Sequence, residues 1–147
     1  MLGAASARPV AASSPLEQGM GAKILIVDDS AIIRRKMADT LGSAGFAVLE
    51  AVDGLDGLEK VAAHPDIQLI FCDLNMPAMN GIELLEQLRA RECEIAVVMM
   101  SSDSQFAFVE RARALGAKGW LMKPFKTELM LVAAKKLSVP PGTPPAG

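Results

Sequence analysis

An α/β fold with a doubly wound, five-stranded parallel sheet is the architecture that this sequence predicts. Short apolar runs, which are typical of strands, alternate along the chain with longer segments in which apolar residues recur at helical spacing. Five such strand–helix pairs follow one another, and strands joined through helices pair in parallel. The first, third and fourth strands are apolar almost throughout, which indicates that helices cover both of their faces.

The first pair consists of a strand over Ile24–Val27 and a helix over Ala31–Ala44. Apolar residues recur in this helix at a spacing of four: Ile33, Met37 and Leu41. Ser30 is a suitable N-cap, and either Gly42 or Gly45 is suited to end the helix.

The second strand is predicted over Ala47–Ala51. The pair Asp53-Gly54 then turns the chain into a helix that ends before Pro65 and carries three apolar residues at helical spacing: Leu55, Leu58 and Val61. The third strand, over Ile67–Cys72, stops at Asp73.

Residues 74–81 form a loop rich in turn residues, and a helix with Ile82, Leu85 and Leu88 on one face follows it. The fourth strand is predicted over Ile95–Met100 and ends at Ser101.

The fifth pair is preceded by a helix over Ser104–Leu115, which Gly116 closes. The last strand is predicted over Lys118–Met122 and is followed directly by Lys123. A final helix extends to about Leu137.

The two ends of the chain have a different composition from the middle. Residues 1–21 are rich in Ala, Ser, Gly and Pro, and residues 139–147 are rich in Pro, so neither segment has a pattern that would bury a face. We expect both to be disordered, which leaves a single domain over residues 22–138.

Charge and composition exclude several classes of function. The net charge is −2, and the only basic cluster, Arg34-Arg35-Lys36, is expected to lie on a solvated helix face, so nucleic acid is not an expected partner. The apolar runs are too short for membrane insertion. Two cysteines, Cys72 and Cys93, are too few for a disulfide framework, and a reducing cytoplasm is the expected compartment.

Polar side chains follow four of the predicted strands: Asp28 and Asp29, then Asp73, then Ser101, then Lys123. The carboxyl ends of parallel strands meet at one edge of a sheet, where ligands bind. Crowded carboxylates repel one another, and a hard cation such as Mg²⁺ relieves that repulsion. A carboxylate can also act as a nucleophile towards phosphorus, with a lysine to bind the phosphoryl oxygens. The pattern therefore indicates phosphoryl chemistry.

Four separated segments of the chain resemble the signature blocks of two-component response-regulator receiver domains. They are residues 24–30 (ILIVDDS), residues 73–81 (DLNMPAMNG), Ser101-Ser102 and Lys123-Pro124-Phe125. The resemblance covers about Lys23 to Leu137. It implies a (βα)5 flavodoxin-like fold with the strand order 2-1-3-4-5.

The resemblance also implies a role for each site residue. Asp73 is the expected phosphoacceptor. Asp29 and Asp73 would bind Mg²⁺ through their side chains and Asn75 through its backbone carbonyl, whereas Asp28 would act mainly through water. Lys123 would pair with the phosphoryl group.

Two further residues would form the switch that reports phosphorylation. Ser101 is the expected switch hydroxyl. Trp120 lies where this family usually carries a Tyr or Phe that swings inward, so its larger ring departs from the family pattern, and a simple packing role is the alternative.

The resemblance implies partners as well. A histidine kinase or histidine phosphotransfer protein would donate the phosphoryl group. A target protein would bind the face formed by the fourth helix, fifth strand and fifth helix, roughly Gln105 to Lys136. The resemblance is also compatible with a dimer that forms upon phosphorylation.

The implied function is a signalling switch that catalyses only its own phosphorylation and dephosphorylation, not an enzyme with a separate substrate. Two alternatives remain open at this stage. One is a Mg²⁺-dependent phosphatase of the haloacid-dehalogenase type, although such enzymes place a second Asp where this chain has Asn75. The other is a pseudo-receiver that docks without being phosphorylated.

Overall fold

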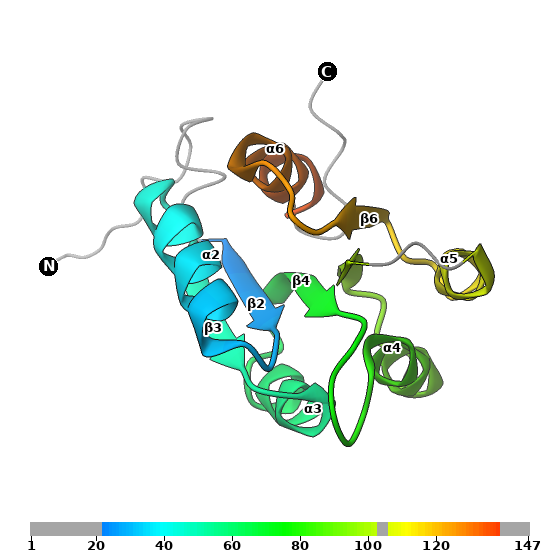
Figure 1. Cartoon of the computed structure of the whole chain (residues 1–147). Helices are drawn as coiled ribbons and strands as arrows, with labels where there is room; N and C mark the ends of the chain where they lie inside the picture. The colour runs from blue at the N-terminus through cyan, green and yellow to red at the C-terminus, as the bar shows by residue number, and fades with distance from the viewer. Residues whose placement is uncertain (1–21, 103–105, 139–147) are drawn as a thin grey trace, which may run out of the picture.

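The computed structural model describes residues 22–102 and 106–138. Within these residues, five strands form one parallel sheet in the order β3-β2-β4-β5-β6 (Figure 1). The strands are β2 (Lys23–Val27), β3 (Ala47–Ala51), β4 (Ile67–Asp73), β5 (Ala96–Ser101) and β6 (Gly119–Met122). The predicted order 2-1-3-4-5 is confirmed. The expected disordered segments 1–21 and 139–147 lie outside the described residues.

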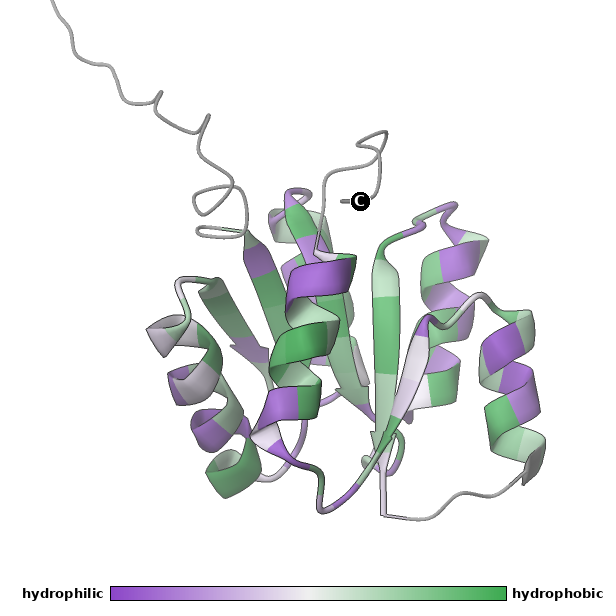
Figure 2. Ribbon diagram, turned by 90° about the horizontal axis from the view of Figure 1, so that it is seen from above, coloured by the Kyte–Doolittle hydropathy of each residue, from purple (hydrophilic) through white to green (hydrophobic). Residues whose placement is uncertain are grey.

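Helices cover both faces of the sheet, as Figures 1 and 2 show. On one face lie α2 (Ala31–Ser43) and α6 (Thr127–Leu137), and on the other lie α3 (Gly54–Ala63), α4 (Gly81–Ala90) and α5 (Phe106–Ala114). The predicted start of α5 at Ser104 falls outside the described residues.

Strand β2 explains why a continuous apolar run predicts a central strand. Ile24 and Ile26 point into the core beneath α2 and α6, whereas Leu25 and Val27 point into the core beneath α3 and α4. All four side chains are fully buried. Burying one such side chain stabilises the fold by about 1.5–3 kcal/mol, so β2 and its neighbour β4 anchor the sheet.

The register of the sheet brings the strand ends together at one edge. Val27 pairs with Cys72, Asp73 with Met100, and Ser101 with Met122. As a result, the residues that follow β2 and β6 lie beside the last residues of β4 and β5. Asp73 and Ser101 are themselves the final residues of their strands, one position beyond the predicted ends.

Side-chain caps fix where the helices begin. The Ser30 hydroxyl accepts a hydrogen bond from the Ile33 N–H at 3.3 Å, as predicted for α2. Asn80 and Glu83 form a reciprocal capping box at the start of α4, where the sequence pattern indicated only a turn. Gly45, with a φ of 101°, follows the end of α2, whereas Gly42 lies inside the helix. Among the described helices, none has the length and apolar character needed to cross a membrane.

Candidate functional site

Three carboxylates meet at the edge of the sheet where the strands end. Asp28 and Asp29 follow β2, and Asp73 ends β4. One carboxylate oxygen from each residue lies within 4.8 Å of the others. Asp28 is fully buried and Asp73 is 6% exposed, whereas Asp29 is open to solvent.

Lys123, which follows β6, lies between the two buried carboxylates. Its Nζ is 2.9 Å from Asp28 Oδ2 and 3.3 Å from Asp73 Oδ1. A single ammonium group therefore contacts two anionic groups, and the third carboxylate is Asp29. One positive charge among three negative charges leaves the group anionic.

Burial and neighbouring charges together shift the pKa values of Asp73 and Lys123. It raises the pKa of the Asp73 carboxyl, and although the Lys123 ammonium works against this effect, the charge of Asp28 reinforces it. Burial by itself disfavours the charged form of Lys123. The hydrogen bond and the charge from Asp28, with the charge of Asp73, outweigh burial and hold the Lys123 pKa above its ordinary value. Lys123 is therefore cationic when it faces these carboxylates.

The turn that carries Asp28 is fixed by hydrogen bonds on several sides. The Ser30 N–H donates to Asp28 Oδ1 at 2.8 Å, and the Asp28 N–H donates to the Ala51 carbonyl at 3.1 Å. Arg34 Nη1 donates to the Asp28 carbonyl at 2.7 Å. The expectation that the whole basic cluster is solvated was wrong for Arg34, whose side chain is 14% exposed, and held for Arg35, at 69%.

The other predicted residues surround this core of the site. The Asn75 backbone N–H donates to the Asp73 carboxylate, and the Asn75 side chain is exposed. Ser101 is fully buried, and its carbonyl accepts a hydrogen bond from the Lys123 N–H at 2.8 Å. Asn75, Ser101 and Lys123 therefore all border Asp73 or its neighbours.

Trp120 lies within β6, two residues before the last residue of that strand. It is half-buried on β6 and packs against the core on the side of α3, α4 and α5. Its indole N–H is buried, and no partner for it occurs in the part of the chain that the structure describes. A purely apolar packing role for Trp120 does not account for this buried N–H, because buried polar groups normally have a hydrogen-bond partner.

Gly81 permits the close approach of α4 to the strand that carries Asp73. A Cβ at this position would lie 2.7 Å from the Asp73 carbonyl oxygen and 2.5 Å from Met99 Cε. From the sequence, Asn80-Gly81 was interpreted first as a turn, within the segment 73–81 that resembles a receiver signature block. A contact of this kind leaves no local signal in the sequence.

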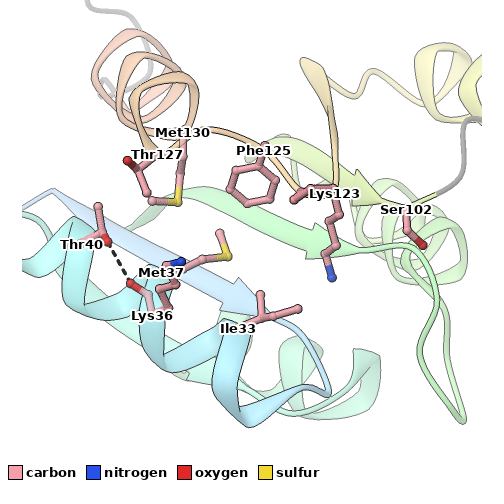
Figure 3. A pocket seen from close by; sticks show the side chains of 10 residues that line it. Ile33, Lys36, Met37, Thr40, Ser102, Lys123, Phe125, Thr127 and Met130 are labelled. Carbon is pink, nitrogen blue, oxygen red and sulfur yellow. Dashed lines mark hydrogen bonds between the residues drawn. The ribbon is translucent and has the colours of Figure 1, made fainter.

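An apolar cavity of about 290 Å³ lies between α2 and α6, next to the acidic group (Figure 3). Its apolar walls include Ile33, Met37, Phe125 and Met130. The Lys123 side chain also lines it, so this side chain connects the cavity with the carboxylates. No sequence pattern pointed to this cavity.

The donor set fits a hard divalent cation. Three carboxylates provide oxygen ligands within 4.8 Å of one another, and Lys123 offsets only one of their charges. Mg²⁺ prefers such oxygen ligands and retains waters, which the exposed side of Asp29 would accommodate.

The chain matches known proteins over nearly all of its described length. The family model described as the response regulator receiver domain matches residues 24–135. Chemotaxis protein CheY1 of Helicobacter pylori is 37% identical over 124 residues, which are 82% of this chain and 98% of that protein. Chemotaxis protein CheY of Bacillus subtilis is 37% identical over 119 residues, 80% of this chain and 98% of that one.

Solved structures agree with these sequence matches. The chemotaxis protein CheY4 of Vibrio cholerae superposes with a TM-score of 0.74 at 34% identity, covering 80% of this chain and 98% of that chain. A CheX–CheY–BeF3–Mg²⁺ complex from Borrelia burgdorferi gives a TM-score of 0.74 at 28% identity, covering 81% and 94%.

Proposed function

This chain belongs to the response regulator receiver domain family, and we propose that it accepts its phosphoryl group on Asp73, with Mg²⁺ bound between Asp29 and Asp73. As a homologue of chemotaxis response regulators, it is a phosphorylation-activated signalling switch. The observation that supports Asp73 is its position: of the two buried carboxylates that contact Lys123, it is the one that keeps some exposure, at 6% against 0% for Asp28, and Asp28 and Asp29 both lie beside it. Receiver domains of this type are signalling proteins, and catalysis of its own phosphorylation and dephosphorylation is part of our proposal.

The proposed transfer assigns one task to each side chain. A carboxylate oxygen of Asp73 attacks the phosphorus of a phosphohistidine, the P–N bond breaks, and the donor imidazole leaves as the acyl phosphate forms. Lys123 exchanges its contact with Asp73 for one with a phosphoryl oxygen. Asp29, Asp73 and the Asn75 carbonyl would hold Mg²⁺, with Asp28 acting through water, and the ion supplies the charge neutralisation that phosphoryl transfer needs.

The switch residues act after transfer. In our proposal the Ser101 hydroxyl donates to a phosphoryl oxygen, which pulls the end of β5 towards Asp73. Trp120 lies on the neighbouring strand β6, and we propose that its indole N–H, which has no partner among the described residues, gains one in the phosphorylated state. Phosphorylation would thereby satisfy a buried hydrogen-bond donor for which the described residues offer no partner before the transfer.

The partners are a phosphodonor and a target protein. The donor is a histidine kinase or histidine phosphotransfer protein. The target binds the face of α5, β6 and α6, where the side chains that the structure describes include three large, apolar and exposed ones: Met122, Leu129 and Val132. The related Borrelia burgdorferi protein was solved with CheX, which supports a protein as the target. The free Cys72 and Cys93 fit a reducing compartment, and we place the protein in the cytoplasm.

The phosphatase and pseudo-receiver alternatives are not favoured. The position that would carry the second Asp of a haloacid-dehalogenase enzyme is Asn75. A docking module would not need two buried carboxylates beside a lysine, which are costly to bury.

Phosphorylation by a small-molecule donor tests the proposal. The full chain is incubated with acetyl phosphate and Mg²⁺, and intact mass spectrometry measures the gain of one phosphoryl group. We expect one addition that needs Mg²⁺ and that disappears in Asp73→Ala. The matched control is Asp66→Ala, which removes an exposed carboxylate that pairs with Lys23. Equal labelling of wild type and Asp73→Ala would refute the assignment.

A further inference from the structure

Arg34 connects the acidic turn to the neighbouring strand. It lies in the first turns of α2, and its guanidinium forms two directed bonds. Nη1 donates to the Asp28 carbonyl at 2.7 Å, and Nε donates to Glu50 Oε1 on β3 at 3.1 Å. The side chain is 14% exposed, so these bonds are largely shielded from water. The residues after β2 are thereby tied to β3.

Asp29 depends on its backbone for its position. The Asp28 carboxylate is held by Lys123 and the Ser30 N–H, and the Asp73 carboxylate is held by Lys123. The Asp29 carboxylate is exposed, and no hydrogen bond or ion pair holds it among residues 22–102 and 106–138. Its position therefore depends on the backbone that carries it, and above all on the peptide group that precedes it.

That peptide group is the one that Arg34 binds. The Asp28 carbonyl and the Asp29 nitrogen and Cα lie in one rigid plane. A guanidinium that holds the carbonyl oxygen fixes this plane, and with it the position of the Asp29 Cα from which the side chain leaves the backbone. We propose that Arg34 is a positioning residue that presents Asp29 to the divalent cation. The inference rests on the proposed function.

The charge of Arg34 cannot itself favour a bound cation. A guanidinium close to the site repels a divalent cation, although the Glu50 carboxylate balances much of its charge. Removal of the positive charge alone should leave Mg²⁺ affinity unchanged or higher. Loss of positioning should lower it. The two effects have opposite signs, so a single measurement separates them.

Isothermal titration calorimetry of the full chain with Mg²⁺ makes this measurement. Loss of a residue that orients a metal ligand typically lowers affinity 10–100-fold, so we expect Arg34→Gln to weaken Mg²⁺ binding by about tenfold or more. The matched control is Arg35→Gln. Arg35 lies on the same helix, has the same charge and pairs with the same Glu50 at 3.5 Å, but its side chain is 69% exposed and makes no contact with Asp28.

Further variants separate positioning from stability. Arg34→Lys keeps the charge but not the fork that binds two acceptors, and it should also weaken Mg²⁺ binding. Glu50→Gln removes the ion pair and leaves the bond to the Asp28 carbonyl, so its Mg²⁺ affinity should stay within about threefold of wild type. Thermal denaturation without Mg²⁺ identifies a temperature at which each variant is folded. If Arg34→Gln is unfolded at all temperatures, Arg34→Lys decides the question.

Two results would overturn the inference. One is wild-type Mg²⁺ affinity in folded Arg34→Gln or Arg34→Lys, and the other is an equal loss in Arg35→Gln. Failure of the proposed function would give results different from these two. The wild-type chain would then bind no Mg²⁺, or Asp73→Ala would bind Mg²⁺ as tightly as wild type does. Wild-type binding and labelling of Asp73, with no effect of Arg34, would refute the positioning role alone.

Discussion

The Lys123 ammonium lies 2.9 Å from the Asp28 carboxylate, although 95 positions separate the two residues in the chain. Asp28 is fully buried, and the Lys123 side chain is 16% exposed. The pair joins the residue after the first described strand to the residue after the last one. A buried carboxylate with no cation nearby is strongly destabilised, so this contact makes the acidic edge of the sheet compatible with a folded chain.

Removal of the Lys123 side chain should therefore lower the free energy of unfolding more than removal of a cationic side chain on the surface does. In Lys123→Met, two buried carboxylates lose their shared ammonium, and without divalent cations we expect a loss of about 3 kcal/mol in the free energy of unfolding. Urea denaturation in the presence of a chelator measures it. Arg111→Met breaks the exposed pair with Glu86 and should cost less than about 1 kcal/mol. An equal loss in the free energy of unfolding of the two variants would show that the buried contact stabilises the fold no more than the exposed pair does.

Asp73 should destabilise the metal-free chain. Burial raises its pKa, so between the ordinary carboxyl pKa and the raised pKa the folded state binds more protons than the unfolded state. Wild-type stability should fall as the pH rises through the raised pKa of Asp73 and stay lower above it. Asp73→Asn removes this contribution. With chelator present, it should have the higher Tm at neutral pH, and the difference should shrink as the pH falls. A lower Tm for Asp73→Asn at neutral pH would contradict this account.

Gly81 and Gly42 provide a matched pair of glycine substitutions. In Gly81→Ala the new methyl group meets the Asp73 carbonyl and Met99, and we expect a loss of about 1–3 kcal/mol. In Gly42→Ala the methyl group has nothing within 4 Å and lies inside α2. This variant should gain about 0.5–1 kcal/mol from helix propensity. Chemical denaturation of both proteins checks the opposite signs. A higher free energy of unfolding in Gly81→Ala than in wild type would mean that α4 can move away from β4 and make room for the methyl group.

Trp120 offers an optical test of the switch, because it is the only tryptophan in the chain. If its buried indole N–H gains a partner after phosphorylation, the fluorescence emission should change when acetyl phosphate is added in the presence of Mg²⁺. The same addition to Asp73→Ala should leave the emission unchanged. An unchanged spectrum in fully phosphorylated wild type would assign Trp120 to packing alone.

The sequence predicted the fold well because its signals are local. The four apolar residues of β2 and the cap at Ser30 are determined by neighbouring residues, and so are the polar positions at the strand ends. The contacts of Arg34 and the cavity beside Phe125 depend on how α2 and α6 pack on the sheet, which local patterns do not encode. The close contact at Gly81 was not predicted for the same reason, because its neighbours Asp73 and Met99 come from other elements.

The identity of the phosphorylated residue is the central claim. Tandem mass spectrometry of the phosphorylated chain, after reductive trapping of the acyl phosphate, locates the modified side chain directly. We predict modification of Asp73 and none of Asp28 or Asp29. Modification of either of those residues in the wild-type chain, or unchanged labelling of Asp73→Asn, would contradict the account.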